Sequence, residues 1–95
     1  MENNKIELKF SNTITRLAGN PYGVQVYSEQ VKSRIEYNKI NIIVFPKYIE
    51  DIAISFVQGF TLDIFNSISK DEFYNYFNIV GSEKVQEKFR KAIFY

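Results

Sequence analysis

The stretch INIIVF at residues 40–45 decides the fold that this sequence predicts. It is a short, almost continuous apolar run, rich in β-branched residues, and Pro46 follows it. Such a run is typical of a strand covered on both faces, and we expect it to be the central strand of a small sheet. The segments on either side should supply the elements that pack around it.

Upstream, the pattern predicts a strand and then a helix. IELKF at 6–10 alternates apolar and polar residues, which favours a strand with one apolar face. Residues 11–23 are rich in turn-forming residues, which predicts a loop. Within it, TITRL at 13–17 is a candidate for a short additional strand. A helix to about Tyr37 follows, and its apolar stripe is formed by Val24, Tyr27, Val31 and Ile35.

Downstream, two further helices flank a third strand. The second helix carries apolar residues every four positions (Phe56, Phe60, Ile64 and Ile68), widened by Ala53, Val57, Leu62 and Phe65. Residues 75–80 are predicted as a strand. Ser82 is the expected N-cap of the last helix, whose apolar face is formed by Val85, Phe89, Ala92 and Ile93.

The predicted fold class is therefore α/β, in the order β-α-β-α-β-α. A short mixed sheet is packed by three helices into a small sandwich, and residues 1–95 form a single domain. Most of the nine Phe side chains are expected to fill its core.

Composition restricts the chemistry that this chain can perform. The absence of Cys and His excludes disulfides, Cys/His zinc sites, thiol nucleophiles and histidine bases. Glu50 and Asp51 are adjacent, so their carboxylates diverge in most conformations and make a poor catalytic pair. We therefore expect no enzyme, with no catalytic, metal-binding or cofactor-binding residues. With no apolar signal core or membrane-spanning run, we expect a soluble, cytoplasmic protein.

Twelve basic and eleven acidic residues leave a net charge of +1, which makes nucleic acid an unlikely partner. A phosphate-binding patch of lysines and arginines with tyrosines as stacking platforms is a possible alternative, but solvated surface charges are the favoured interpretation. Its members would be Arg16, Arg34, Lys39 and Lys47, with Tyr22, Tyr37 and Tyr48.

Three pieces of sequence in this order resemble a known family: GNPYGVQVYSEQV at 19–31, INIIVF at 40–45 and ISFVQGF at 54–60. The chain resembles the STAS-like domains of unknown function, which are related in fold to sulphate-transporter and anti-sigma-factor-antagonist domains. The resemblance covers about residues 14–94. Its matched positions are Thr15-Arg16, Gly23-Val24, and Ser55-Phe56 with Phe60.

Two positions depart from the family pattern. Val44, Phe45 and Pro46 stand where family members often carry an acidic residue at the end of the central strand. In phosphorylatable relatives the acceptor serine begins the second helix, and here Ile54 aligns with the acceptor while Ser55 is its neighbour. The resemblance therefore argues against a phosphoryl switch. We favour Ser55 as a helix N-cap over Ser55 as a phosphorylation site.

The resemblance implies a non-enzymatic regulatory module that docks on a protein partner, with a histidine-kinase-like ATPase as the candidate. The expected docking surface comprises the 19–23 loop and residues 50–60, and its partner-binding residues are Tyr22, Tyr48, Glu50, Asp51 and Ser55. Gly59 either admits a partner to this surface or relieves crowding inside the domain. The alternative function is a small mobile-element or phage inhibitor of a nucleic-acid-handling host enzyme. The oligomeric state stays open.

Overall fold

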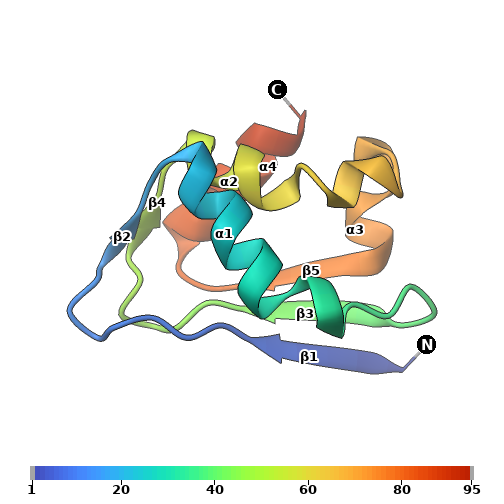
Figure 1. The fold of residues 1–95 in the computed structure, drawn as a ribbon, viewed down its shortest axis with the longest axis horizontal. Coiled ribbons are helices and arrows are strands. Elements are labelled where there is room, and N and C mark those ends of the chain that lie inside the picture. The colour runs from blue at the N-terminus through green and yellow to red at the C-terminus, as the bar shows by residue number, and fades with distance from the viewer. Residues whose placement is uncertain (1, 95) are drawn as a thin grey trace.

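The main sheet has three parallel strands, and the INIIVF segment lies at its centre. The structure, a computed structural model, describes residues 2–94 (Figure 1). Strand β3 (Ile40–Val44) pairs with β1 (Asn3–Glu7) on one side and with β5 (Phe77–Val80) on the other. The α/β fold class and the central position of β3 are confirmed. The predicted mixed sheet is wrong, because both pairings are parallel.

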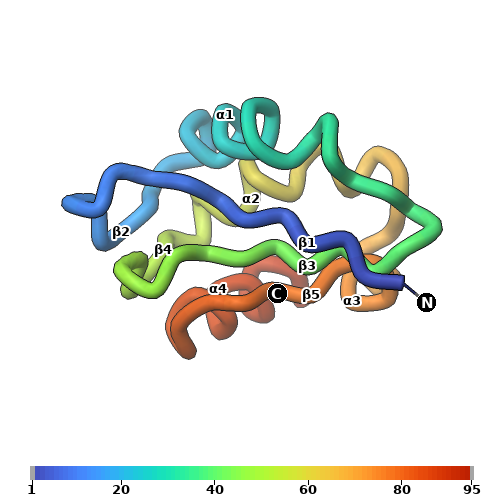
Figure 2. The backbone as a smooth tube through the Cα atoms, turned by 90° about the horizontal axis from the view of Figure 1, so that it is seen from below, coloured from blue at the N-terminus to red at the C-terminus, as the bar shows by residue number. Residues whose placement is uncertain are grey.

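The long helices all lie on one side of this sheet. They are α1 (Asn20–Gln30), α2 (Ile54–Thr61) and α4 (Glu83–Phe94). Figure 1 shows them above the strands, and Figure 2, seen from below, shows no helix in front of the three strands. The strand order β1-β3-β5 advances in one direction, so two crossovers of the same hand must place α1 and α2 on the same face. The result is two layers, helices over a sheet.

A second sheet of two short parallel strands leads into α1 and α2. Strand β2 (Arg16–Leu17) pairs with β4 (Asp51–Ile52), and the backbone amide of Ala53 donates to the carbonyl of Leu17. The short strand expected within TITRL is thus confirmed, whereas β4 was not predicted. This pairing sets the first turns of α1 and α2 beside each other.

Helix α1 begins earlier and ends earlier than its apolar spacing predicts. It starts at Asn20 with Pro21 in its first turn, where a missing amide proton costs nothing, and a 3-10 turn (Lys32–Arg34) follows it. The predicted stripe is wrong at Val24, which is 37% exposed, while Val26 is buried. The cause is the close packing of α1 on α2, which turns a glycine rather than Val24 toward the neighbouring helix.

Helix α2 ends at Thr61, shorter than predicted, and 3-10 turns (Ile64–Asn66 and Lys70–Glu72) follow. Phe56, Phe60 and Ile64 are buried as expected, but Leu62 is 60% exposed and its predicted place in the apolar arc is wrong. Two residues beyond Phe60 correspond to about 200° around a helix, which is the opposite side.

The predicted strand 75–80 begins two residues late. The short helix α3 (Phe73–Tyr76) comes first, and only Phe77–Val80 are extended. The N-cap prediction for the last helix is confirmed, because the Ser82 hydroxyl accepts a hydrogen bond from the Val85 amide at 3.2 Å.

Aromatic side chains form the centre of the core. The largest fully buried residues are Phe56, Phe60, Phe73, Phe77 and Phe89, which come from α2, α3, β5 and α4. Phe60 packs edge-on against Phe89, and Phe73 stacks on Phe77 with 5.0 Å between ring centroids. The expectation that most Phe side chains fill the core is confirmed.

The central strand is covered on one face only within the described residues. Asn41 and Ile43 are buried, whereas Ile40, Ile42 and Val44 alternate with them and stay partly exposed. The prediction of a strand covered on both faces is therefore wrong, because every helix packs on the same side.

One buried polar residue ties the sheet to its surroundings. The side chain of Asn41 is fully buried, donates to the carbonyls of Glu36 (3.0 Å) and Tyr76 (3.1 Å), and accepts from the Glu36 amide (2.9 Å). It also accepts from the side-chain amide of Asn4 on β1, at 2.8 Å. These bonds satisfy the buried amide. They also connect β3 to β1, to the turn before β3 and to the end of α3.

Helices α1 and α2 touch through two glycines. A Cβ atom added at Gly59 would overlap the backbone carbonyl of Asn20, and one added at Gly23 would overlap the carbonyl of Phe56. Both glycines are helical and buried. The two alternatives for Gly59 are thus resolved toward contact inside the domain.

We expect Gly59→Ala to lower the free energy of unfolding by about 1–3 kcal/mol, because the new methyl meets backbone that cannot move aside cheaply. A loss of stability would be informative, because alanine inside a helix is ordinarily more stable than glycine by about 1 kcal/mol. Urea denaturation measures the change. Gln58→Ala, an exposed neighbour on α2, is the control and should stay within about 0.5 kcal/mol of wild type. A stabilised Gly59→Ala protein would contradict the contact.

Candidate functional site

Asp51 lies where β2, β4 and α4 meet. One carboxylate oxygen, Oδ1, accepts from Lys88 Nζ at 3.1 Å and from the Ile52 amide at 2.9 Å, and Oδ2 lies 3.7 Å from Arg16 Nε. Partial burial favours the protonated acid, but the bonds from Lys88 and Ile52 and the nearby Arg16 charge outweigh it and lower the pKa of Asp51. The carboxylate is engaged within the domain.

Ser55 bonds to another part of the chain and does not cap its own helix. Helix α2 begins at Ile54, its N-cap residue is Ala53, and no side chain caps it. The hydroxyl of Ser55 instead accepts from the backbone amide of Gly19 at 3.2 Å. The N-cap prediction is wrong, because Ser55 lies two residues after the N-cap position, which Ala53 occupies. The hydroxyl satisfies a backbone donor of the loop before α1.

The other predicted partner-binding residues differ in how free they are. Tyr22 packs edge-on against Phe56, with 5.7 Å between ring centroids. The Tyr48 hydroxyl donates to the carbonyl of Phe10. Glu50 is exposed, and its backbone carbonyl accepts from the Ser82 hydroxyl at 2.8 Å. Among the five residues, only Glu50 has an exposed side chain. The side chains of the other four make contacts within the domain.

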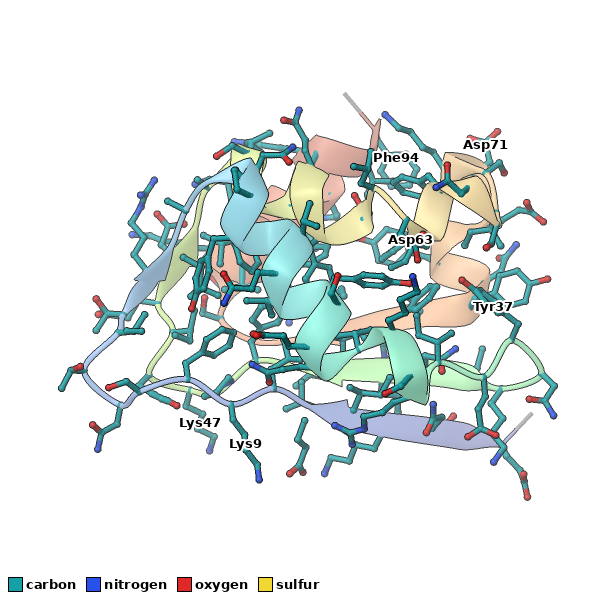
Figure 3. All side chains as sticks on the ribbon, viewed as in Figure 1. Lys9, Tyr37, Lys47, Asp63, Asp71 and Phe94 are labelled. Carbon is teal, nitrogen blue, oxygen red and sulfur yellow. The ribbon has the colours of Figure 1, made fainter. Side chains whose placement is uncertain are left out.

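The predicted phosphate-binding patch is not gathered in one place. Arg16 faces Asp51, Arg34 donates to a backbone carbonyl of β1, and Lys39 lies 3.5 Å from the Glu36 carboxylate. Figure 3 shows Lys47 and Tyr37 at opposite ends of the sheet. The solvated-charge interpretation fits this placement.

A groove lies between α2 and α4, and its larger cavity is mostly apolar while its smaller cavity is nearly half polar. It consists of two adjoining cavities of about 430 and 320 Å³ that share Gln58 and Ala92. The first is also lined by Ile54 and Lys91, and the second by Thr61, Leu62, Phe65 and Lys70. We call this surface the α2–α4 groove.

The chemistry of the groove combines apolar walls with two lysines. Leu62 is 60% exposed, the largest exposure among the large apolar side chains of residues 2–94. Lys91 lies 3.1 Å from the Glu87 carboxylate and remains half exposed, and Lys70 is exposed beside the other cavity. Such a surface suits apolar side chains that are accompanied by carboxylates.

Sequence reasoning assigned Leu62 to the core and so missed the groove, whereas Ala92 does pack against the core and lines the groove with its remaining surface. The signal was present in the spacing of α2, because Leu62 does not follow the four-residue repeat of Phe56 and Phe60. Ile54 was noted only as a departure from the family pattern.

Comparison with protein-family models, curated proteins and solved structures finds no match to the chain. In residues 2–94 no three acidic side chains gather closely enough to hold a metal ion. None of the helices in that range has the length and apolarity to cross a membrane.

Removing the Ser55 hydroxyl should loosen the loop before α1. We expect Ser55→Ala to lower the free energy of unfolding by about 1 kcal/mol, because the partly buried Gly19 amide loses its acceptor. Urea denaturation measures the loss, and amide hydrogen exchange at Gly19 should accelerate. Unchanged exchange at Gly19 would show that the bond does not form.

Because Asp51 forms ion pairs, its contribution to the free energy of unfolding should depend on pH. Its pKa is lowered in the folded protein, so its stabilisation is present above the unfolded pKa of about 3.9 and disappears as pH falls through the folded value. We expect Asp51→Asn to cost at most about 1 kcal/mol at neutral pH. Thermal unfolding followed from neutral to acidic pH should show the difference vanish. Glu50→Gln, which removes an exposed neighbouring carboxylate, should show no such trend.

Proposed function

We propose that this chain is a non-enzymatic interaction module that binds a protein partner in the α2–α4 groove. The observation that carries the proposal is a groove whose larger cavity, at Ile54 and Ala92, is mostly apolar and adjoins a more polar cavity beside the exposed Leu62. Exposed apolar surface of this kind marks interaction sites. The partner segment that fits is an amphipathic helix with apolar anchors and flanking Asp or Glu.

The charges at the groove support this choice of partner. Lys70 and Lys91 contribute a positive charge to each cavity, and Lys91 is only partly neutralised by exposed Glu87. Acidic residues at the ends of a bound segment would meet both lysines. A basic segment would meet them with repulsion, so the lysines select the sign of the partner.

The resemblance to STAS-like domains extends this proposal to a partner class. Ile54 aligns with the phosphate-accepting position of phosphorylatable relatives and lines the larger cavity. An isoleucine at this position cannot be phosphorylated, so its apolar contact with a partner would not be regulated by phosphorylation. A histidine-kinase-like ATPase is the partner class that the resemblance suggests, and it stays an inference from likeness alone. The mobile-element inhibitor stays the alternative prediction.

A synthetic helical peptide with leucines at i, i+3 and i+7 and glutamates at both ends tests the groove. Fluorescence anisotropy should detect binding with a Kd of about 10–100 µM, as expected for a short docking segment. The same peptide with lysines in place of the glutamates should bind at least about tenfold more weakly. Equal binding of the two peptides would contradict the role of Lys70 and Lys91.

Ala92→Arg places a large side chain at the point shared by the two cavities. We expect it to weaken peptide binding at least about tenfold. Because Ala92 also packs partly against the core, circular dichroism should first show that the variant is folded. Asn12→Arg, in the exposed loop before β2, is the control and should bind like wild type. Binding that survives Ala92→Arg would place the peptide elsewhere and overturn the groove assignment.

A further inference from the structure

The lower face of the main sheet is bare in residues 2–94. Figure 2 views this face directly, and no helix lies in front of β1, β3 and β5. Ile40, Ile42 and Val44 of the central strand point to it, together with Val80 of β5, which is 42% exposed. We call this surface the open face.

An uncovered face is unusual for this type of sheet. Parallel sheets occur almost only with both faces covered, and the apolar run of β3 is the composition expected of a strand inside two layers. Here α1, α2 and α4 cover one face, and the apolar composition of β3 is typical of a strand whose second face is also covered. The open face therefore calls for an occupant from outside the described residues.

The charges on the open face are arranged in a way that is complementary to itself. Lys5 and Glu7 lie two residues apart on edge strand β1, both point to this face, and their charged groups are 3.2 Å apart. The register aligns Lys5 with Ile42 and Asn78, and Glu7 with Val44 and Val80. The face thus has an apolar column along β3, with a lysine and a glutamate in successive rows beside it.

If the strands of the two copies are aligned, two choices of two-fold axis pack this face on a second copy. An axis along the strands would put β1 over β5, so that Glu7 would lie over Val80 of the second copy. An axis across the strands puts β1 over its own copy in the opposite direction. Lys5 then lies over Glu7 of the second copy and Glu7 over Lys5, while Ile42 meets Val44.

We propose that the open face is the interface of a symmetric dimer, in which a second copy of this chain packs with its strands antiparallel to those of the first. Face-to-face sheets lie about 10 Å apart, a gap that lysine and glutamate side chains span together. The dimer closes the apolar column of β3 on both copies and forms two reciprocal charge pairs at its edges. Lys9 and Lys47, which Figure 3 shows projecting below the sheet beyond its strands, stay at the solvated rim.

The size of the face sets the strength of the dimer. Three strands about 4.8 Å apart and five residues long cover about 14 by 16 Å. This footprint is well below the roughly 800 Å² that each partner contributes to a standard interface. The dimer is therefore weak and concentration-dependent, with a dissociation constant on the order of 100 µM.

Sedimentation velocity of the purified chain, from about 10 µM to about 1 mM, tests the proposal across the range in which such a dimer forms. Wild type should move from monomer to dimer. Lys5→Glu alone and Glu7→Lys alone should each raise the dissociation constant at least about tenfold, because like charges then face each other. Both substitutions replace exposed residues on an edge strand, and circular dichroism should show both proteins folded.

Mixing the two single variants is the decisive measurement. The acidic pair of one chain then faces the lysine pair of the other, so the mixture should dimerise although neither protein does so alone. The double variant with both reversals should dimerise like wild type. Ala92→Arg, in the α2–α4 groove, should leave dimerisation unchanged, which separates this interface from the proposed peptide site.

Several results would overturn the dimer. One is a chain that stays monomeric to about 1 mM, a concentration about ten times the dissociation constant proposed for the dimer. Another is a dimer that is indifferent to both charge reversals, and a third is a mixture of the variants that does not associate. Protection of the open face only by a different protein, or by a further segment of a longer chain, would assign the occupant to that protein or segment instead.

Discussion

The arrangement of this molecule depends on the contact between α1 and α2 through Gly23 and Gly59. Side chains larger than hydrogen at these positions would overlap the opposite backbone, so the glycines set how closely the helices approach. The close approach brings the Gly19 amide to the Ser55 hydroxyl and the Tyr22 ring to Phe56. Two of the five residues that sequence reasoning assigned to partner binding, Tyr22 and Ser55, lie at the perimeter of this contact.

Because both crossovers step in the same direction, the helices crowd one side of the sheet, and two surfaces of different character result. The α2–α4 groove lies on the helical layer, where Leu62 is on the opposite side of the α2 axis from Phe60 and is exposed. The open face lies on the opposite layer, where the apolar residues of β3 have no cover in the described residues. A single chain of this shape is able to meet two kinds of neighbour without competition between them.

The sequence predicts the α/β class, the element order, the central strand and the cap of the last helix because each rests on local spacing. It fails where contacts distant in sequence decide. Val24 is exposed because Gly23 faces α2, Ser55 bonds to a loop 36 residues away, and Asp51 finds Lys88 on the last helix. The sidedness of the layers also follows from topology. The apolar spacing of INIIVF is the same for a strand covered on both faces and for a strand covered on one face.

The buried amide of Asn41 has a consequence for how uniquely the strands align. A slip of β3 by one residue would turn Asn41 to the open face and bring Ile40 or Ile42 to the junction with Asn4, Glu36 and Tyr76. The Glu36 amide and the Tyr76 carbonyl would then lose their bonds to Asn41, so misaligned sheets are penalised more heavily than the apolar exchange alone would penalise them. Asn41 thus acts as a lock on strand alignment, in a segment whose other residues would tolerate sliding.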